Sequence, residues 1–416
     1  MKILALILVL SVSSLEIVAQ TNNSPYSALG IGDIEDSYFN RTSGMANTGI
    51  AFRSNRFLIG NNPASFSAQD NQFFGGETAV RGMLVTYYGP SVNPGSNKSS
   101  DITFRKIIFG IKPTKYWGTS VGLVPYSSQS YQFNNPQPIL GTNGETSNAY
   151  YEGFGGLNKV YWANSYEFFH HLSLGVDFAY LFGSVQQKVI LQDANQNELV
   201  STLNNTSLNN FAVDFGVQYY TSITKKWDLS IGATFMPKTY LQAQNVVTVR
   251  GADSVELTTP IVNEYLYKLP LSVGAGIALS KNHKYTFLAD YKYQNWSALN
   301  YSGFNYALRD SRYMSVGFEY SKHKTAYNLI YETMYLQAGL YYKNTYLNVY
   351  GQQINDMGVT AGIGINAKRS ALGYSFVLQY GVRGTPDNQL IQERYTSLTF
   401  VLSYRDIWYT KGRKFN

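Results

Sequence analysis

From about residue 72 onward, apolar and polar side chains alternate along the chain with a period of two. Within residues 172–183, bulky residues such as Phe178 alternate with small or polar ones such as Asp177. Residues 208–222 and 370–383 follow the same pattern. Successive side chains of a β-strand point to opposite faces of the sheet, so each segment presents one bulky apolar face and one small or polar face. The pattern therefore predicts an all-β protein.

About fourteen such segments can be distinguished by their alternation. They fall near residues 72–88, 100–112, 116–130, 150–164, 170–188, 208–222, 226–248, 265–280, 283–297, 309–321, 332–346, 356–367, 370–383 and 391–408. The connections between them alternate in length, and the long ones span residues 89–99, 131–149, 189–207, 249–264, 298–308, 347–355 and 384–390. This regularity predicts an antiparallel meander whose two ends differ, one with short turns and one with long loops.

Composition separates a membrane barrel from a soluble β-sandwich or propeller, which would be equally rich in strands. A soluble sheet exposes a charged face to water, yet charged residues make up only 14% of this chain, against about 25% in soluble domains. Aromatic residues reach 15%, with 36 tyrosines. In hydrocarbon, strands satisfy their backbone groups only by closing into a barrel. We therefore expect a transmembrane antiparallel β-barrel of about 14 strands in a Gram-negative outer membrane.

The N-terminal residues have the organisation of a secretory signal peptide. Lys2 precedes an apolar run over residues 3–12, and small residues follow up to Ala19. We expect cleavage after Ala19, so that residues 1–19 are removed. The barrel is then expected over residues 72–410, and a basic periplasmic tail over residues 411–416.

Residues 20–71 lack sustained alternation and are rich in glycine. They end in the turn-forming sequence Asn62-Pro63-Ala64 and contain apolar side chains that can pack, such as Phe66. We expect this segment to be an N-terminal hatch or plug in the barrel lumen, with Asn62, Pro63 and Ala64 at the hatch or gate. A partly ordered periplasmic extension is the alternative.

The net charge of +7 has a local explanation. If the first strand runs outward, the short turns lie in the periplasm, and they carry pairs such as Lys225-Lys226. Four tryptophans then fall at inner strand ends and one at an outer end, as expected of aromatic girdles: Trp117, Trp162, Trp227 and Trp408, and Trp296. The basic rim explains the positive charge without nucleic acid, and we expect it to be solvated rather than in contact with lipid phosphates. Outer-membrane lipids are the expected partners of the apolar barrel exterior.

Candidate chemical motifs do not form a catalytic or metal-binding set. The chain has no cysteine. The serine pattern at residues 118–122 lies inside a predicted strand, away from the strand–turn–helix elbow that a nucleophilic serine needs. The acidic start at Asp193 lacks the glycine of a calcium loop, and His170-His171 would point to opposite faces of a strand. We expect no enzymatic activity, no catalytic residues, no cofactor and no metal.

Ionisable residues within the strands are placed inward by the alternation. Since such groups are costly on the lipid face, we expect them to line the lumen. The candidates are Asp177, Asp214, Asp228, Asp290, Lys292, Glu319 and Arg405. They form either a structural network that holds the hatch and braces the wall, or the lining of a substrate path or gate.

Several short motifs resemble one known family. Residues 41–51 (Arg41, Gly44-Met45-Ala46, Thr48-Gly49-Ile50-Ala51), the sequence Asn62-Pro63-Ala64 and residues 358–364 are similar to the long-chain fatty acid transporter family, the OMPP1/FadL/TodX type. The resemblance covers most of the mature chain. It implies a fourteen-stranded barrel with an N-terminal hatch, and uptake of hydrophobic molecules with lateral or hatch-gated release.

Two functions are therefore expected, with a general porin as a weaker third. The first is an outer-membrane channel for passive uptake of hydrophobic or amphipathic, fatty-acid-like small molecules, gated by the hatch. The alternative is a non-transporting barrel that acts as an accessory or docking subunit of an outer-membrane secretion machinery, with a protein partner in that membrane. An apolar pocket between the outer loops and the hatch would favour the first function, and a lumen packed shut would favour the second.

Overall fold

The computed structural model describes residues 24–407, apart from residues 91, 93–94, 96, 135–136, 139–145, 194–196, 304, 327–328 and 368–370. The expected signal peptide, Trp408 and the basic tail lie outside the described residues. None of the described helices is long and apolar enough to cross a membrane.

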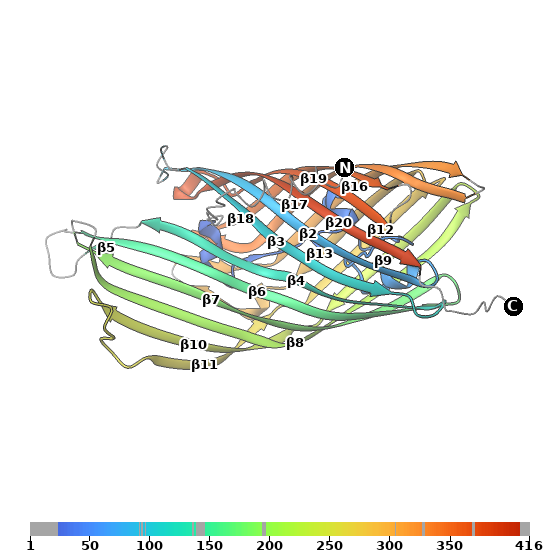
Figure 1. Cartoon of the computed structure of the whole chain (residues 1–416). Coiled ribbons are helices and arrows are strands. Elements are labelled where there is room, and N and C mark those ends of the chain that lie inside the picture. Colours follow the sequence, from blue (N-terminus) through green and yellow to red (C-terminus); the bar gives the residue numbers. More distant parts are fainter. Residues whose placement is uncertain are drawn as a thin grey trace, which may run out of the picture.

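The described strands form a closed antiparallel barrel of fourteen strands, as the alternation predicts (Figure 1). In chain order they are β2 (Phe73–Tyr88), β3 (Lys98–Ile111), β4 (Trp117–Asn134), β6 (Thr146–Phe168), β7 (Leu172–Gln192), β8 (Glu198–Thr224), β9 (Trp227–Met236) continued by β10 (Thr239–Gly251), β11 (Ile261–Leu269) continued by β12 (Ser272–Lys281), β13 (Tyr285–Gln294), β16 (Ser311–Ala326), β17 (Leu329–Val349), β18 (Gln352–Asn366), β19 (Leu372–Arg383) and β20 (Gln392–Ile407). β20 pairs with β2 along its whole length, which closes the barrel.

Proline interrupts two of these strands. Pro237 separates β9 from β10, and Pro270 separates β11 from β12. Proline has no backbone N–H and is excluded from the middle of a paired strand. Each long predicted segment is therefore one membrane strand made of two shorter ones with a bend between them.

The prediction of a long loop is wrong at two places, residues 189–207 and residues 347–355. β7 ends at Gln192 and β8 begins at Glu198, so most of residues 189–207 is strand, and β17 and β18 are joined through Tyr350-Gly351 alone. β8 has 27 residues, whereas about 9–11 tilted residues cross a bilayer. Where such a strand leaves the hydrocarbon, nothing requires an apolar outer face, and the alternation that marks a strand is lost.

The outward faces of the strands carry the bulky apolar side chains. Phe211 is 73% exposed and Phe178 is 48% exposed, whereas Ser173 and Gln218 on the opposite face are fully buried. The expected place of Trp296 in an outer girdle is wrong, because this side chain is fully buried and stacks on Tyr346 with 4.6 Å between ring centroids. The chain turns inward after β13 ends at Gln294.

Residues 24–72, which we call the N-terminal segment, precede the first wall strand. The segment contains the short helices η1 (Pro25–Ala28), η2 (Arg41–Met45) and η3 (Pro63–Ala68) and the two-residue strand β1 (Asp33–Ile34). Figure 1 shows it in blue, surrounded by the strands. It contacts wall strands as far apart in the chain as β4 and β18.

Candidate functional site

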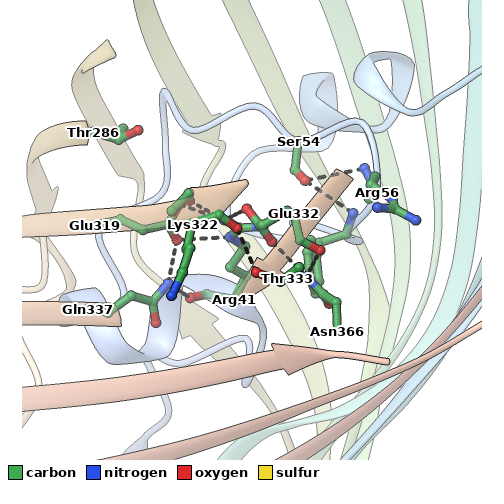
Figure 2. Close-up of polar contacts among 12 residues, drawn as sticks. Arg41, Ser54, Arg56, Thr286, Glu319, Lys322, Glu332, Thr333, Gln337 and Asn366 are labelled. Atoms are coloured by element: carbon green, nitrogen blue, oxygen red, sulfur yellow. Dashed lines mark hydrogen bonds and ion pairs between the residues drawn. The ribbon is translucent and has the colours of Figure 1, made fainter. Parts of the chain in front are cut away.

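The most highly connected side chain between the N-terminal segment and the wall is Arg41 (Figure 2). Its Nε and Nη2 donate to the two carboxylate oxygens of Glu319 at 2.8 and 2.6 Å. Its Nη1 and Nη2 donate to both oxygens of Glu332 at 3.0 and 2.6 Å. The guanidinium also lies over the ring of Tyr335, 4.2 Å from its centroid. One buried cation thus joins η2 to two neighbouring wall strands, β16 and β17.

Two amides complete this cluster. Gln337 Nε2 donates to the Arg41 carbonyl oxygen and to Glu319, each at 2.7 Å, and Asn366 Nδ2 donates to Glu332 at 2.8 Å. Burial by itself would lower the pKa of Arg41, but the carboxylates of Glu319 and Glu332 raise it well above its ordinary value. Arg41 therefore remains charged and neutralises part of a buried acidic pair.

Asn62, Pro63 and Ala64 lie against the wall at the level of β7, β8 and β9. Asn62 Nδ2 donates to the carbonyl oxygens of Val217 at 3.1 Å and Ala233 at 3.2 Å, and Asn62 Oδ1 accepts from the Ala64 N–H. A side chain on Gly175 would place its Cβ 2.3 Å from the Ala64 nitrogen. Glycine is therefore required here for the backbone of the segment to approach the wall.

Asp290 holds the middle of the N-terminal segment. Its Oδ2 accepts the backbone N–H groups of Gly49 at 2.7 Å and Ile50 at 2.9 Å. Lys292, two residues further along β13, lies with its Nζ 5.6 Å from the ring centroid of Tyr313. Asp290 thus acts as a buried carboxylate acceptor for backbone donors of the segment.

A second buried ionic cluster lies in the wall itself. Asp177 on β7 pairs directly across the sheet with Asp214 on β8, and Lys159 Nζ lies 2.7 Å from the first and 2.5 Å from the second carboxylate. The lysine cancels the repulsion between two like charges that face each other on adjacent strands.

The two remaining predicted residues, Asp228 and Arg405, differ in their position relative to these clusters. Asp228 is at the start of β9, near the turn that contains His283, and accepts a hydrogen bond from Ser222 Oγ at 2.6 Å. Arg405 donates to Asn366 Oδ1 at 2.6 Å, and its guanidinium lies 4.3 Å from the ring centroid of Phe57. Arg405 is therefore linked through Asn366 to the Arg41 cluster, while Asp228 is at a rim.

A cavity of about 480 Å³ lies between the N-terminal segment and the walls formed by β2–β4 and β17–β20. Acidic residues of the segment face basic wall residues here. Arg383 donates to both oxygens of Asp33 at 2.6 and 2.7 Å, and Lys343 is paired with Asp36. These residues were not among the sequence predictions, although residues 33–36 form an unusually acidic run in a chain with few charges.

The barrel wall is incomplete beside this cavity. β3 pairs with β4 only over Ile107–Ile111, although β3 begins at Lys98. Further along β4, the N-terminal segment takes the place of β3, and its strand β1 pairs with β4 through Asp33↔Ser128 and Ile34↔Ser127. Ile102 and Phe154, both exposed on the outside, also line the cavity. The cavity therefore reaches the outer surface of the barrel between β3 and β4.

The described residues contain no cluster of three or more His, Asp or Glu side chains that could hold a metal ion. Most of the ionisable residues predicted for the lumen are instead engaged with charged groups, amides or backbone groups. This arrangement is suited to holding the N-terminal segment in place and to presenting a polar cavity beside an apolar outer surface.

A closed fourteen-stranded barrel with an apolar exterior is an outer-membrane protein, and its fold is that of the FadL type. Similar solved structures are a Pseudomonas aeruginosa FadL homologue (TM-score 0.60, 12% identity, 94% of this chain and 100% of that chain), the Ralstonia pickettii toluene transporter TbuX (0.58, 14%, 88% and 97%) and the Pseudomonas putida toluene transporter TodX (0.58, 15%, 89% and 98%). None of the curated proteins matches the chain.

A family model named BamG matches residues 1–416. The chain therefore belongs to the BamG family and has a barrel fold of the FadL type.

Proposed function

We propose that this protein is an outer-membrane channel for passive uptake of small amphipathic molecules. The observation that carries the proposal is the lumen cavity that reaches the barrel exterior between β3 and β4. A solute that enters this cavity from outside the cell has a path into the membrane plane without crossing the N-terminal segment. The similar structures of toluene transporters and a FadL homologue support a channel of this kind.

The lining of the cavity favours an amphipathic solute over a pure hydrocarbon. Inside are charged residues such as Arg81 and Asp101, while the opening to the exterior is flanked by Ile102 and Phe154. Arg81 Nη1 donates to Glu35 at 3.2 Å, so the cavity presents paired charges that a polar head group can contact. A fatty-acid-like molecule would place its head among these groups and its chain in the opening.

We further propose that residues 20–71 act as the hatch of this channel, with Asn62, Pro63 and Ala64 as its seat on the wall. Asp290 and Glu319, on the neighbouring strands β13 and β16, bind groups of the segment, and Asn62 of the segment binds carbonyl groups of β8 and β9. On this proposal the lumen candidates Asp177, Asp214, Asp228, Lys292 and Arg405 brace the wall and the hatch rather than contact the solute.

Filling the cavity tests the proposed path. We expect Thr103→Trp, on the inward face of β3, to lower the initial rate of uptake of a fluorescent long-chain fatty acid by about tenfold, equivalent to about 1.4 kcal/mol. The measurement uses liposomes that contain the purified full chain. Val80→Trp, on the lipid-facing side of neighbouring β2, is the matched control and should transport normally. Equal rates for both variants, or uptake no faster than in empty liposomes, would contradict the proposal.

A second candidate function is a non-transporting barrel that serves as an accessory or docking subunit of an outer-membrane secretion machinery. It is supported by the dense polar contacts that hold the N-terminal segment across the lumen, and by membership of a family named BamG rather than after a transporter. Native mass spectrometry of the purified protein distinguishes the two. A stoichiometric protein partner without bound lipid would favour docking, and bound amphiphile without a partner would favour the channel.

A further inference from the structure

The pairing of strands in the barrel wall is interrupted at a second place, along β11, which lies on the extracellular side of the bend between β11 and β12. β12 pairs along all ten of its residues with β9 on one side and β13 on the other. Ten tilted residues are about the length that crosses the hydrocarbon core. β11, which precedes β12 in the chain, therefore lies beyond the membrane on the outer side.

β11 is paired on one edge alone. All nine residues of β11 (Ile261–Leu269) pair with residues of β10. No described strand pairs with the other edge of β11. At the end of that edge nearest β12, the Lys268 N–H donates to the hydroxyl of Tyr301 at 2.7 Å. In an antiparallel strand, alternate residues direct both backbone groups to the same side. The N–H and C=O groups of Val262, Glu264 and Leu266 therefore point to the open edge.

Residues 261–266 of this edge lack the protection that free strand edges usually carry, whereas Lys268 and its contact with Tyr301 protect the other end. Natural proteins shield such edges with proline, lysine, a bulge or a covering loop. Here residues 261–266 are exposed on both faces, and Val262 and Leu266 are 55% and 56% exposed. A strand edge with unpaired backbone groups and exposed apolar side chains such as Val262 and Leu266 is a template for another extended chain.

The space beside the edge also fits side chains of such a chain. A cavity of about 490 Å³ lies beside β11, bounded by the hairpin of β14 (Ser302–Gly303) and β15 (Tyr306–Leu308), by β7, β8 and β10, and by residues 28–31 of the N-terminal segment. Its described lining contains tyrosines, amides and aliphatic groups but no charged side chain. The hydroxyl of Tyr267, which lines it, is buried and has no hydrogen-bond partner among the described residues. That hydroxyl is a polar group aimed at an occupant.

We propose that the open edge of β11 binds an extended segment of a partner protein, which adds a strand to this sheet outside the cell. The backbone of that segment would pair with Val262, Glu264 and Leu266. Uncharged side chains on one face would enter the tyrosine-lined cavity, and a lysine or arginine on the other face would lie opposite Glu264. This inference does not rest on the proposed channel, because the cavity beside β3 has no part in it. The tyrosine-lined cavity is bounded on one side by residues 28–31 of the N-terminal segment.

A second copy of this chain does not fit the edge. Two copies in one membrane have the same orientation relative to the bilayer, so their β11 strands run in the same direction. They are then unable to form the antiparallel pair that a symmetric edge-to-edge dimer needs. Centring such a pair on Glu264 would in addition place two like charges opposite each other. The occupant is therefore a different polypeptide.

Single cysteines in the full chain test the proposal, because the native sequence has none. We expect Val262→Cys to react with a membrane-impermeant maleimide about tenfold more slowly in intact cells than in the purified barrel, since pairing protects an edge from solvent. Leu199→Cys is the matched control, because Leu199 is 48% exposed and lies on β8, which is paired on both edges. It should react equally in both preparations.

A variant that blocks the open edge distinguishes strand addition from shielding of residue 262 by a molecule bound in another way. Leu266→Pro removes one outward N–H while the pairing with β10 is kept, and it should restore fast labelling of Val262→Cys in cells. A photo-crosslinking residue at position 264 should give an adduct with another polypeptide, and Leu266→Pro should abolish that adduct. Equal labelling in cells and in purified protein, protection that persists with Leu266→Pro, or an adduct of twice the chain's mass would each overturn the proposal.

Discussion

Replacing Arg41 with methionine is expected to release the N-terminal segment and open the lumen. Methionine keeps much of the side-chain volume but leaves Glu319 and Glu332 buried without their cation. Removing one partner of a buried ion pair typically costs about 3–5 kcal/mol. We therefore expect Arg41→Met to raise the single-channel conductance in planar bilayers and the rate of proteolysis within residues 24–72.

The matched control is Arg56→Met in the same segment, since Arg56 forms no ion pair among the described residues, although Figure 2 shows it close to the cluster. It removes the same charge and should leave conductance unchanged. A closed channel in Arg41→Met, with protease resistance like that of the unchanged protein, would show that the ion cluster does not hold the hatch.

Replacing Lys159 with methionine is expected to destabilise the barrel wall itself. Asp177 and Asp214 would then face each other across β7 and β8 with no cation between them. By the same reasoning the expected loss is about 3–5 kcal/mol in the free energy of unfolding. Urea unfolding in detergent micelles, followed by tryptophan fluorescence, measures it.

Neutralising the acids should rescue this variant. In the triple variant Lys159→Met, Asp177→Asn, Asp214→Asn, no buried charge is left unpaired, so most of the lost stability should return. If the triple variant were as unstable as Lys159→Met, lost packing of the lysine chain would be the cause and the electrostatic explanation would be wrong.

The sequence predicts the wall better than it predicts what the wall encloses. Strands are recognisable where hydrocarbon requires apolar side chains at every second position, as in β7 and β19. The requirement ends at the membrane surface, and the sequence therefore predicts a loop over residues 198–207, where β8 extends beyond the membrane. The break in the wall at β3 depends on which edges pair and is marked by no residue pattern, whereas Pro270 marks the bend at β11 but does not show that its edge is open.

Only some of the residues in the polar clusters can be predicted from the sequence. Alternation places Asp177, Asp214 and Glu319 inward. It does not identify Lys159, because the inward Leu157 and Tyr161 are as bulky and apolar as the outward residues of β6. The pairing of Arg41 with Glu319 joins residues 278 positions apart, one of them in a segment without periodicity. Such a contact follows from the closed barrel and is not encoded by any local pattern.

The contacts between the N-terminal segment and the last wall strands determine the order in which this molecule can assemble. The segment is synthesised first, yet Ser24 contacts Glu393 and Asp33 contacts Arg383, on strands made last. Contacts so distant in sequence form late, because the long intervening chain must be ordered before they are gained. β2, directly after the segment, closes the barrel only when β20 arrives. These contacts of the segment therefore form only after the last strand is in place.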